Sequence, residues 1–290
     1  MQDIKIEIFF DPMTYTASYI VYDNKTRDAV IIDSVLNLDL TSGSITTDSA
    51  DELRSYVHKN KLKIHYILET HVHADHLSAA AYLKHHYHAK TGIGAAIVDV
   101  QSIFGKLYNI KDIKGDGSDF DVLLKDNDCL KAGSMDIRCL ATPGHTPACM
   151  TYVIQGNAFV GDTLFMPDFG SARCDFPGGC AETLYESIQK ILTLGNKVNI
   201  YVGHDYAPNG REYEFVASIA DHLENNIHIN QCISREKFIK MRTERDSELS
   251  PPRLLLPSLQ VNIKAGQLPT PEENETRYLK IPLIVKEIDK

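Results

Sequence analysis

The segment ETHVHADH holds four side chains of metal-binding type within six positions: His71, His73, Asp75 and His76. Three more such residues lie further along the chain: His145, Asp162 and His204. Each of these three follows a short apolar run, and the run HYIL comes just before His71. Loops beyond strand ends are where α/β folds gather their ligand sites, because the sheet holds them in place. We therefore expect these residues to converge on one site.

The chemistry that needs such a cluster is metal binding. A divalent ion requires neutral imidazoles and carboxylates that converge within about 2.0–2.2 Å of one point. A loop can supply imidazoles at i and i+2, as His71 and His73 do, and Asp75 and His76 are expected at the start of the next helix. Seven ligand-type groups exceed the need of one ion. They can serve two ions bridged by a carboxylate, or one ion whose ligands are oriented by the remaining groups.

The elements that must position these residues repeat a theme in the two halves of the chain. The first half has the β-type runs IKIEIFF, ASYIVYD and DAVIID, then the helical pattern ADELRSYVHKN and a second helix from about Leu77 to His88. The second half has further β-type runs, followed by the helical segments CAETLYESIQKILTL and REYEFVASIADHLENN. Two halves of this kind predict two packed sheets flanked by helices, a layered α/β architecture.

The organisation predicted for the chain is a catalytic domain over residues 1–230 and a C-terminal extension over 231–290. The extension begins with the charged helix SREKFIKMRTERDSEL and continues as the Pro-rich tail SPPRLLLPSLQVNIKAGQLPTPEE. We expect the extension to pack on the first domain, and the tail offers a surface for a homodimer.

Composition excludes several classes of partner. The formal net charge of the 290 residues is −9 and no long basic run occurs, so neither nucleic acid nor an anionic membrane is expected as a partner. No signal peptide or transmembrane run is apparent. The six cysteines show no CxxC spacing, which favours reduced thiols and a cytoplasmic location. Cys174 and Cys180 flank the DFPGG loop, where either a redox role or an idle thiol is compatible with the sequence.

The motifs THVHADH, TPGHTP, GDTLF and GHDY, in this order, resemble those of the metallo-β-lactamase superfamily. The resemblance covers nearly all of residues 5–225. It implies a four-layer αββα sandwich with the metal at one edge. Because substrates vary widely on one fold, this resemblance alone does not define the reaction.

The segments HADHLSAAAYLK and ARCDFPGG and the C-terminal tail are similar to those of bacterial persulfide dioxygenases and β-lactamase-hydrolase-like proteins. This similarity implies one Fe(II) per chain, held by His71, His145 and Asp162. Such a facial triad leaves positions open for substrate and O2. The implied reaction oxidises glutathione persulfide with O2 and water to glutathione and sulfite. Four residues would then orient the ligands and hold water: His73, Asp75, His76 and His204.

The same resemblance suggests roles for three residues around the metal: Tyr206, Arg173 and Asp75. Arg173 is expected to hold a glutathione carboxylate through its planar guanidinium, or else to form a salt bridge to a nearby aspartate. Tyr206 is expected to donate a hydrogen bond to the bound sulfur or oxygen, or else to be an ordinary core tyrosine.

Glyoxalase II-type enzymes provide the alternative. They share the seven ligands but hydrolyse glutathione thioesters with two metals, so two zinc ions or a mixed pair would replace the single iron. The tail of this chain stands where those enzymes carry a helical glutathione-binding domain, which favours the dioxygenase. A metal-binding regulator without catalysis and a β-lactam hydrolase are poorer explanations, because the expected coordination is open and no export signal is apparent.

Overall fold

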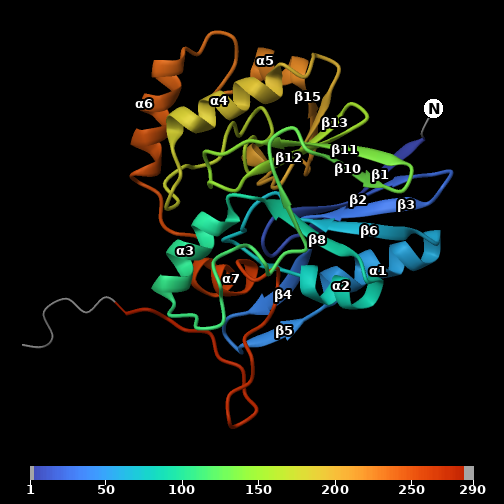
Figure 1. Ribbon diagram of the computed structural model, residues 1–290. Coiled ribbons are helices and arrows are strands. Elements are labelled where there is room, and N and C mark those ends of the chain that lie inside the picture. The colour runs from blue at the N-terminus through green and yellow to red at the C-terminus, as the bar shows by residue number, and fades with distance from the viewer. Residues whose placement is uncertain (1–2, 284–290) are drawn as a thin grey trace, which may run out of the picture.

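Two β-sheets lie face to face in the middle of the molecule, and helices cover the outer side of each sheet (Figure 1). The computed structural model describes residues 3–283. The first sheet has the order β1-β2-β3-β6-β8-β9 and the second the order β10-β11-β12-β13-β14-β15. α1, α2, α3 and α7 lie beside the first sheet, and α4, α5 and α6 lie beside the second (Figure 1). The predicted four-layer αββα sandwich is confirmed.

The strands of the first sheet are β1 (Ile4–Asp11), β2 (Thr16–Asp23), β3 (Asp28–Ile32), β6 (Lys63–Leu68), β8 (Lys90–Gly94) and β9 (Val122–Leu124). Those of the second are β10 (Cys129–Ala132), β11 (Met135–Ala141), β12 (Met150–Ile154), β13 (Asn157–Gly161), β14 (Asn199–Val202) and β15 (Val216–Ser218). A small sheet joins β4 (Val35–Asp39) to β5 (Ser44–Thr46) and β7 (Leu77–Ser78). The helices are α1 (Asp48–Asn60), α2 (Ala80–Tyr87), α3 (Ile97–Leu107), α4 (Ala181–Leu192), α5 (Ile219–Asn225), α6 (Arg235–Asp246) and α7 (Leu255–Asn262).

Strand β2 shows how the sequence builds the layers. All eight of its residues are buried, because both faces of this strand are covered. Tyr19 and Val21 point into the apolar core between the two sheets, whereas Ile20 and Tyr22 pack with the helix layer beside the first sheet. Successive side chains of a strand point to opposite faces, so one β-branched and aromatic run fills both cores.

Parallel pairing brings the ligand-bearing strand ends to one edge. β3 and β6 are parallel neighbours in the first sheet, and β13 and β14 are parallel neighbours in the second. β11 runs in the same direction as β13, because each pairs antiparallel with β12. Within each sheet the carboxyl ends of these strands therefore open on one edge, and the 3.9 Å between His71 Nε2 and Asp162 Oδ2 brings the two edges together.

Two helices predicted from the sequence begin later than expected. The helix expected from Leu77 starts at Ala80, because Leu77 and Ser78 pair with β4 as β7, and this strand separates His76 from the helix. The helix expected over 211–226 starts at Ile219, where Ser218 forms a capping box with Asp221.

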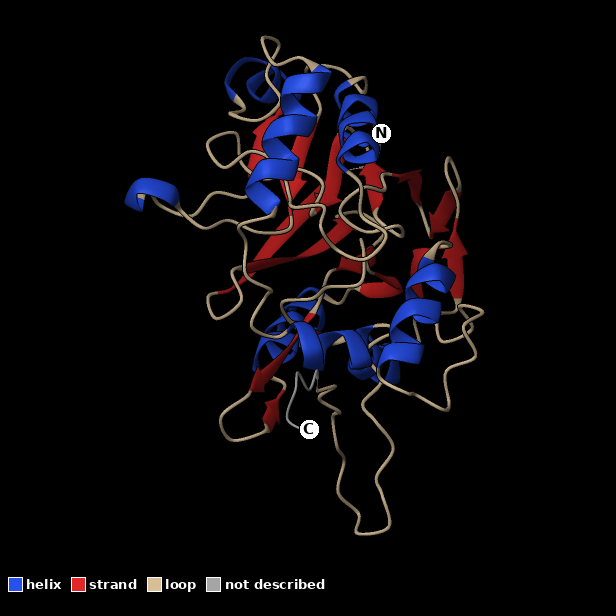
Figure 2. Ribbon diagram, turned by 90° about the vertical axis from the view of Figure 1, so that its left-hand side faces the viewer, coloured by secondary structure: helices blue, strands red, loops and turns tan. Residues whose placement is uncertain are grey.

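The C-terminal extension contains a helix that the sequence did not lead us to expect. α7 forms within the Pro-rich tail, and its proline, Pro257, lies in the first turn, where no intrahelical donor is lost. α6 packs on α4, while α7 packs on β7 and α3. Beyond α7 the chain runs as a loop that projects from the body (Figure 2). The division at residue 230 stays a prediction, and positions 284–290 of the extension lie outside the described residues.

No helix within residues 3–283 is long and apolar enough to cross a membrane. The six cysteines are free thiols. Cys174 is buried with its thiol 3.3 Å from Asp246 Oδ2, and the Cys180 thiol lies 3.2 Å from Glu182 Oε2.

Candidate metal centre

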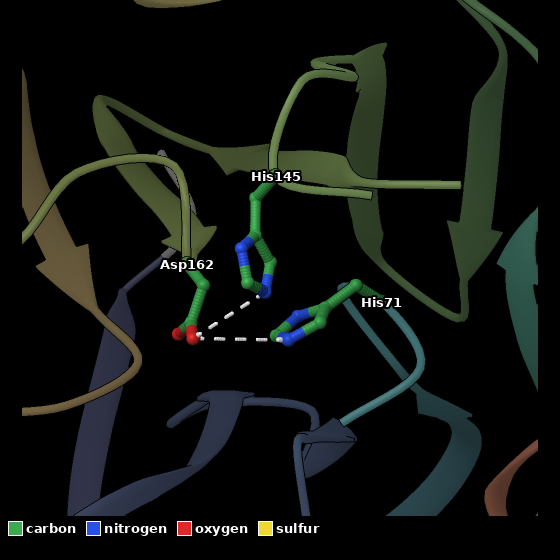
Figure 3. Close-up of side chains that lie close together, drawn as sticks. All are labelled: His71, His145 and Asp162. Carbon is green, nitrogen blue, oxygen red and sulfur yellow. Dashed lines mark ion pairs between the residues drawn. The ribbon is translucent and has the colours of Figure 1, made fainter. Parts of the chain in front are cut away.

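His71, His145 and Asp162 point toward one another at the common edge of the two sheets (Figure 3). Asp162 Oδ2 lies 3.9 Å from His71 Nε2 and 3.8 Å from His145 Nε2. One ligand atom from each of the three residues lies within 4.8 Å of the others. Two donors that each lie about 2 Å from one ion are at most about 4 Å apart, and both separations from Asp162 fall within that limit.

The hydrogen bonds of the imidazoles favour the form that binds a metal. His145 Nδ1 donates to the carbonyl of Arg173 at 2.7 Å. His71 Nδ1 lies 3.0 Å from Thr70 Oγ1, whose own proton goes to Asp33, so this hydroxyl accepts from the imidazole. Burial and the neighbouring His73 and His145 hold the pKa of His71 well below its usual value. In a neutral imidazole, a proton on Nδ1 leaves Nε2 free to bind a metal, and in both rings Nε2 is the atom nearest Asp162.

A second group of ligand-type residues consists of His73, Asp75 and His204, and its His204 approaches the other oxygen of Asp162. His204 Nε2 lies 3.4 Å from Asp162 Oδ1 and 3.4 Å from Asp75 Oδ2. Burial lowers the pKa of His204, but the two carboxylates outweigh this effect and raise it. Asp162 therefore lies between two groups of donors, one on each of its oxygens. This geometry suits either one ion whose ligands are oriented by the second group, or two ions that share the Asp162 carboxylate.

Unpartnered buried atoms show that the residues present fit a metal. Within residues 3–283, four buried donor or acceptor atoms of the seven predicted ligand residues form no hydrogen bond: His71 Nε2, His73 Nδ1, His76 Nε2 and Asp162 Oδ1. A buried polar atom without a partner costs about 1–3 kcal/mol. Their concentration in one place is explained if they face a cation, so the cluster has the donors that a metal cofactor requires.

The structure brings together all seven predicted ligand-type residues and adds two that the sequence analysis missed. Buried Asp33 accepts from Thr70 N at 2.7 Å and lies 3.0 Å from His73 Nε2. Glu69 Oε2 lies 3.3 Å from His73 Nε2, which leaves His73 Nδ1 to face the site. Asp33 directly follows the apolar run of β3. The other ligands were identified by the same pattern, a His or Asp just after an apolar strand, which we call the strand-end rule.

Small residues beside the ligands allow the two sheets to approach. Gly161, which precedes Asp162, has φ +51°, and a Cβ there would lie 2.2 Å from Thr70 Oγ1. Gly203, which precedes His204, would place a Cβ 2.7 Å from Asp162 Oδ1. A Cβ at position 161 would displace Thr70, which orients His71, and a Cβ at position 203 would displace Asp162, so glycine is required at both strand ends.

Asn262, at the end of α7, holds the loop that carries the first four ligands. Its Nδ2 donates to the carbonyls of His73 at 2.8 Å and His76 at 2.7 Å, while its Oδ1 accepts from Ser78 N at 2.7 Å. The side chain is buried. These three bonds fix the irregular backbone between β6 and β7 from the C-terminal extension.

We expect Asn262→Leu to weaken metal binding by about ten-fold or more, the effect typical of groups that orient ligands. Affinity is measured by competition with a chromophoric chelator, and unfolding of the metal-free protein is measured in parallel. Gln260→Leu is the matched control, because Gln260 lies on the same helix but bonds the carbonyls of Leu256 and Lys280. Equal metal affinities in the two variants would show that Asn262 does not support the site.

The loop that orients His145 is fixed by α6. The carbonyl of Arg173 accepts from His145, and the next residue, Cys174, donates its backbone N–H to Asp246 Oδ2 at 2.8 Å. Asp246 also binds Arg242 Nε at 2.9 Å in a buried pair, and Arg242 donates to the carbonyl of Ser171. Both ligand loops are thus held by helices of the C-terminal extension.

The side chain of Arg173 forms a salt bridge to an aspartate, which is the second of the two roles expected for it from the sequence. Its Nε and Nη2 bind Asp175 at 2.5 and 2.6 Å, and its remaining donors reach the carbonyls of Leu249 and Ser250. The guanidinium is therefore engaged within the protein, and its expected role as a glutathione anchor stays a prediction.

Tyr206 lies at the solvent side of the cluster. Its ring stacks on His204 with centroids 5.9 Å apart and contacts Phe169 at 4.8 Å, while the residue keeps 40% of its surface exposed. Partial burial and the carboxylates of Asp162 and Asp75 raise the pKa of Tyr206, so its phenol stays protonated at neutral pH. Asp75 and Tyr206 both line a cavity of about 480 Å³ that opens to solvent.

Comparison with known proteins agrees with this architecture. The sequence model of the metallo-beta-lactamase superfamily matches residues 12–204. A probable metallo-hydrolase of Burkholderia pseudomallei is 50% identical over 96% of this chain and 98% of its own length. The mitochondrial persulfide dioxygenase ETHE1 of Homo sapiens is 29% identical over 92% of this chain and 91% of its own. The crystal structure of ETHE1 from Myxococcus xanthus superposes with a TM-score of 0.72 and 28% identity, covering 91% of this chain and all of that one. With the fold, the ordered motifs and the metal-type cluster in agreement, the chain belongs to the metallo-beta-lactamase superfamily.

Proposed function

We propose that this protein is a non-haem Fe(II) persulfide dioxygenase that converts glutathione persulfide, O2 and water to glutathione, sulfite and two protons. The observation that carries the proposal is the convergence of His71, His145 and Asp162, two imidazoles and one carboxylate whose ligand atoms lie within 4.8 Å of one another. The 2-His-1-carboxylate set is typical of iron sites that react with O2. The likeness to ETHE1 along nearly the whole chain supports the same assignment.

Fe(II) at these residues would supply the redox chemistry toward O2. The chain's own groups perform the remaining tasks. The carbonyl of Arg173 and the hydroxyl of Thr70 orient the two imidazoles. In this proposal His204 and Asp75, which lie 3.4 Å apart, hold the water that the reaction consumes, and Tyr206 donates a hydrogen bond to the substrate from the cavity side.

A hydrolase of glutathione thioesters is the second candidate, and a specific observation favours it. His73, Asp75 and His204 form a second complete donor group, and Asp162 lies between the two groups. That arrangement suits two zinc ions or a mixed pair and a bridging water. The relative from Burkholderia pseudomallei bears the name of a metallo-hydrolase.

One experiment separates the two candidates. Protein produced with adequate iron and purified without O2 is analysed for metal, then assayed for O2 uptake and sulfite with glutathione persulfide and for thiol release from S-lactoylglutathione. About one iron per chain with stoichiometric O2 uptake and sulfite supports the dioxygenase. Two zinc ions per chain, thioester hydrolysis and no O2 uptake would assign the hydrolase. A cytoplasmic location and a homodimer stay predictions from the sequence.

Arg173→Ala distinguishes the two roles considered for that residue. Because the guanidinium already pairs with Asp175, we expect the free energy of unfolding to fall by about 1 kcal/mol and KM for glutathione persulfide to change little. Thermal unfolding and O2-uptake kinetics measure the two effects. Unchanged stability with KM raised about ten-fold or more would instead establish Arg173 as the carboxylate anchor.

A further inference from the structure

The cavity beside the metal-type cluster has one cationic side chain in its lining, Arg253. This cavity of about 480 Å³ is bounded by the β4–β5 hairpin, the turn between β1 and β2, Tyr206, and the segment that leads into α7. Asp75 connects it to the second donor group. A volume of a few hundred Å³ is in the range of small-molecule sites.

Arg253 differs from Arg173 in having its guanidinium available. It is exposed, and within residues 3–283 it takes part in no hydrogen bond or ion pair. Arg173, by contrast, is bound to Asp175 and to two backbone carbonyls. A free, planar guanidinium at the edge of a cavity can bind a carboxylate through two parallel hydrogen bonds, as an engaged one cannot.

The remaining charges of the cavity restrict the kind of ligand. Four carboxylates line it: Asp11, Asp39, Asp48 and Asp75. Hydrogen bonds from Ser42 and Thr41 lower the pKa of Asp39, which keeps this residue on the β4–β5 hairpin charged. A ligand with negative charges alone would be repelled by this lining. A zwitterion places its ammonium among the acids and a carboxylate at Arg253.

We propose that Arg253 is the substrate-anchoring residue of this cavity and that the ligand is a zwitterionic amino-acid thiol derivative of the glutathione type. This proposal rests on the proposed function for the identity of the thiol. The proposal assigns recognition of the substrate to the C-terminal extension, because Arg253 lies in the segment between α6 and α7. The same anchor would serve a persulfide or a thioester, since both carry the glutathione carboxylates.

The test uses S-methylglutathione as a probe, because a blocked sulfur does not turn over and does not depend on which reaction the metal performs. Its Kd for the metal-loaded protein is measured by calorimetry at low and high salt. We expect Arg253→Gln to raise Kd by about ten-fold at low salt and by less at high salt, where exposed charges are screened. Arg253→Lys should recover only part of the loss, because an ammonium lacks the planar fork.

Arg235→Gln is the matched control, since Arg235 is an exposed arginine of α6 paired with Glu186 and lies outside the cavity lining. The diethyl ester of S-methylglutathione, which has no free carboxylate, should bind wild type and Arg253→Gln alike. N-acetylation of the probe should weaken binding to the wild type by removing the ammonium. Measuring the probe and its diethyl ester on both the wild type and Arg253→Gln isolates the contact between the guanidinium and the carboxylate.

An unchanged Kd in Arg253→Gln, or no binding of the probe to the wild type, would overturn the anchor. Equal losses for the probe and its diethyl ester would also overturn it, because the effect would then not involve a carboxylate. Failure of the proposed dioxygenase function would be seen separately. The wild-type protein would then show no O2 uptake, while its binding of the probe would still depend on Arg253.

Discussion

Asp162→Ala is expected to lose metal and activity together. Asp162 supplies the only carboxylate of the facial group, and its two oxygens face His71 and His145 on one side and His204 on the other. Its removal leaves several buried imidazoles around the ion with no negative charge to balance it. A metal ion stabilises the transition state by several kcal/mol, so activity should fall by roughly a thousand-fold or more.

The measurement combines elemental analysis with O2 uptake on glutathione persulfide. Asp136→Ala serves as a control, because Asp136 is an exposed aspartate of β11 paired with Lys131. Thermal unfolding in excess chelator separates metal loss from misfolding. The metal-free variant should still unfold in one cooperative transition, like the metal-free wild type, which shows that loss of metal is not loss of the fold. Retention of metal by Asp162→Ala would refute the assignment of the ligands.

His204→Ala is expected to reduce activity far more than iron content. In the single-iron arrangement His204 is not a ligand: it contacts Asp162 and Asp75 on the side away from His71 and His145. Its loss removes a group that orients the ligand carboxylate and holds water. Such groups contribute about 10- to 100-fold to activity or affinity, so the iron should stay while turnover falls by about two orders of magnitude.

His71→Ala provides the comparison, because it removes a ligand of the facial group and should therefore lose the iron itself. Metal content per chain and turnover number are measured on both variants from the same preparation conditions. A loss of one of two metals in His204→Ala, with one metal left in place, would show that the second donor group binds its own ion. That result would favour the thioester hydrolase.

The strand-end rule explains how much of the site was visible in the sequence. Ligands carried by strand ends depend on local patterns, an apolar run followed by His or Asp, and the fold brings such ends to one edge. Asp33 satisfies the same rule, but one aspartate after a β run is common, and its importance appears only when His73 and Thr70 are seen beside it.

Other features had no local signal. β7 is a two-residue strand whose existence depends on pairing with β4, so the helix after His76 was expected too early. The prolines around α7 are typical of irregular segments, so the sequence analysis did not predict this helix. Asn262 lies 186 and 189 positions from the residues it holds, and it lies beyond residue 204, where the family match ends. Contacts over such separations leave no periodic pattern for sequence reasoning to read.

Because α6 and α7 support the ligand loops, the metal-type cluster must form in a certain order while the chain is synthesised. Every ligand of the cluster has left the ribosome once residue 204 has emerged, yet the bonds from Asp246 and Asn262 form only after these later residues have emerged. The nascent chain therefore presents the imidazoles and carboxylates of the cluster before the bonds that fix their loops can form. We therefore expect discrimination between metal ions to depend on α6 and α7 as well as on the ligands themselves.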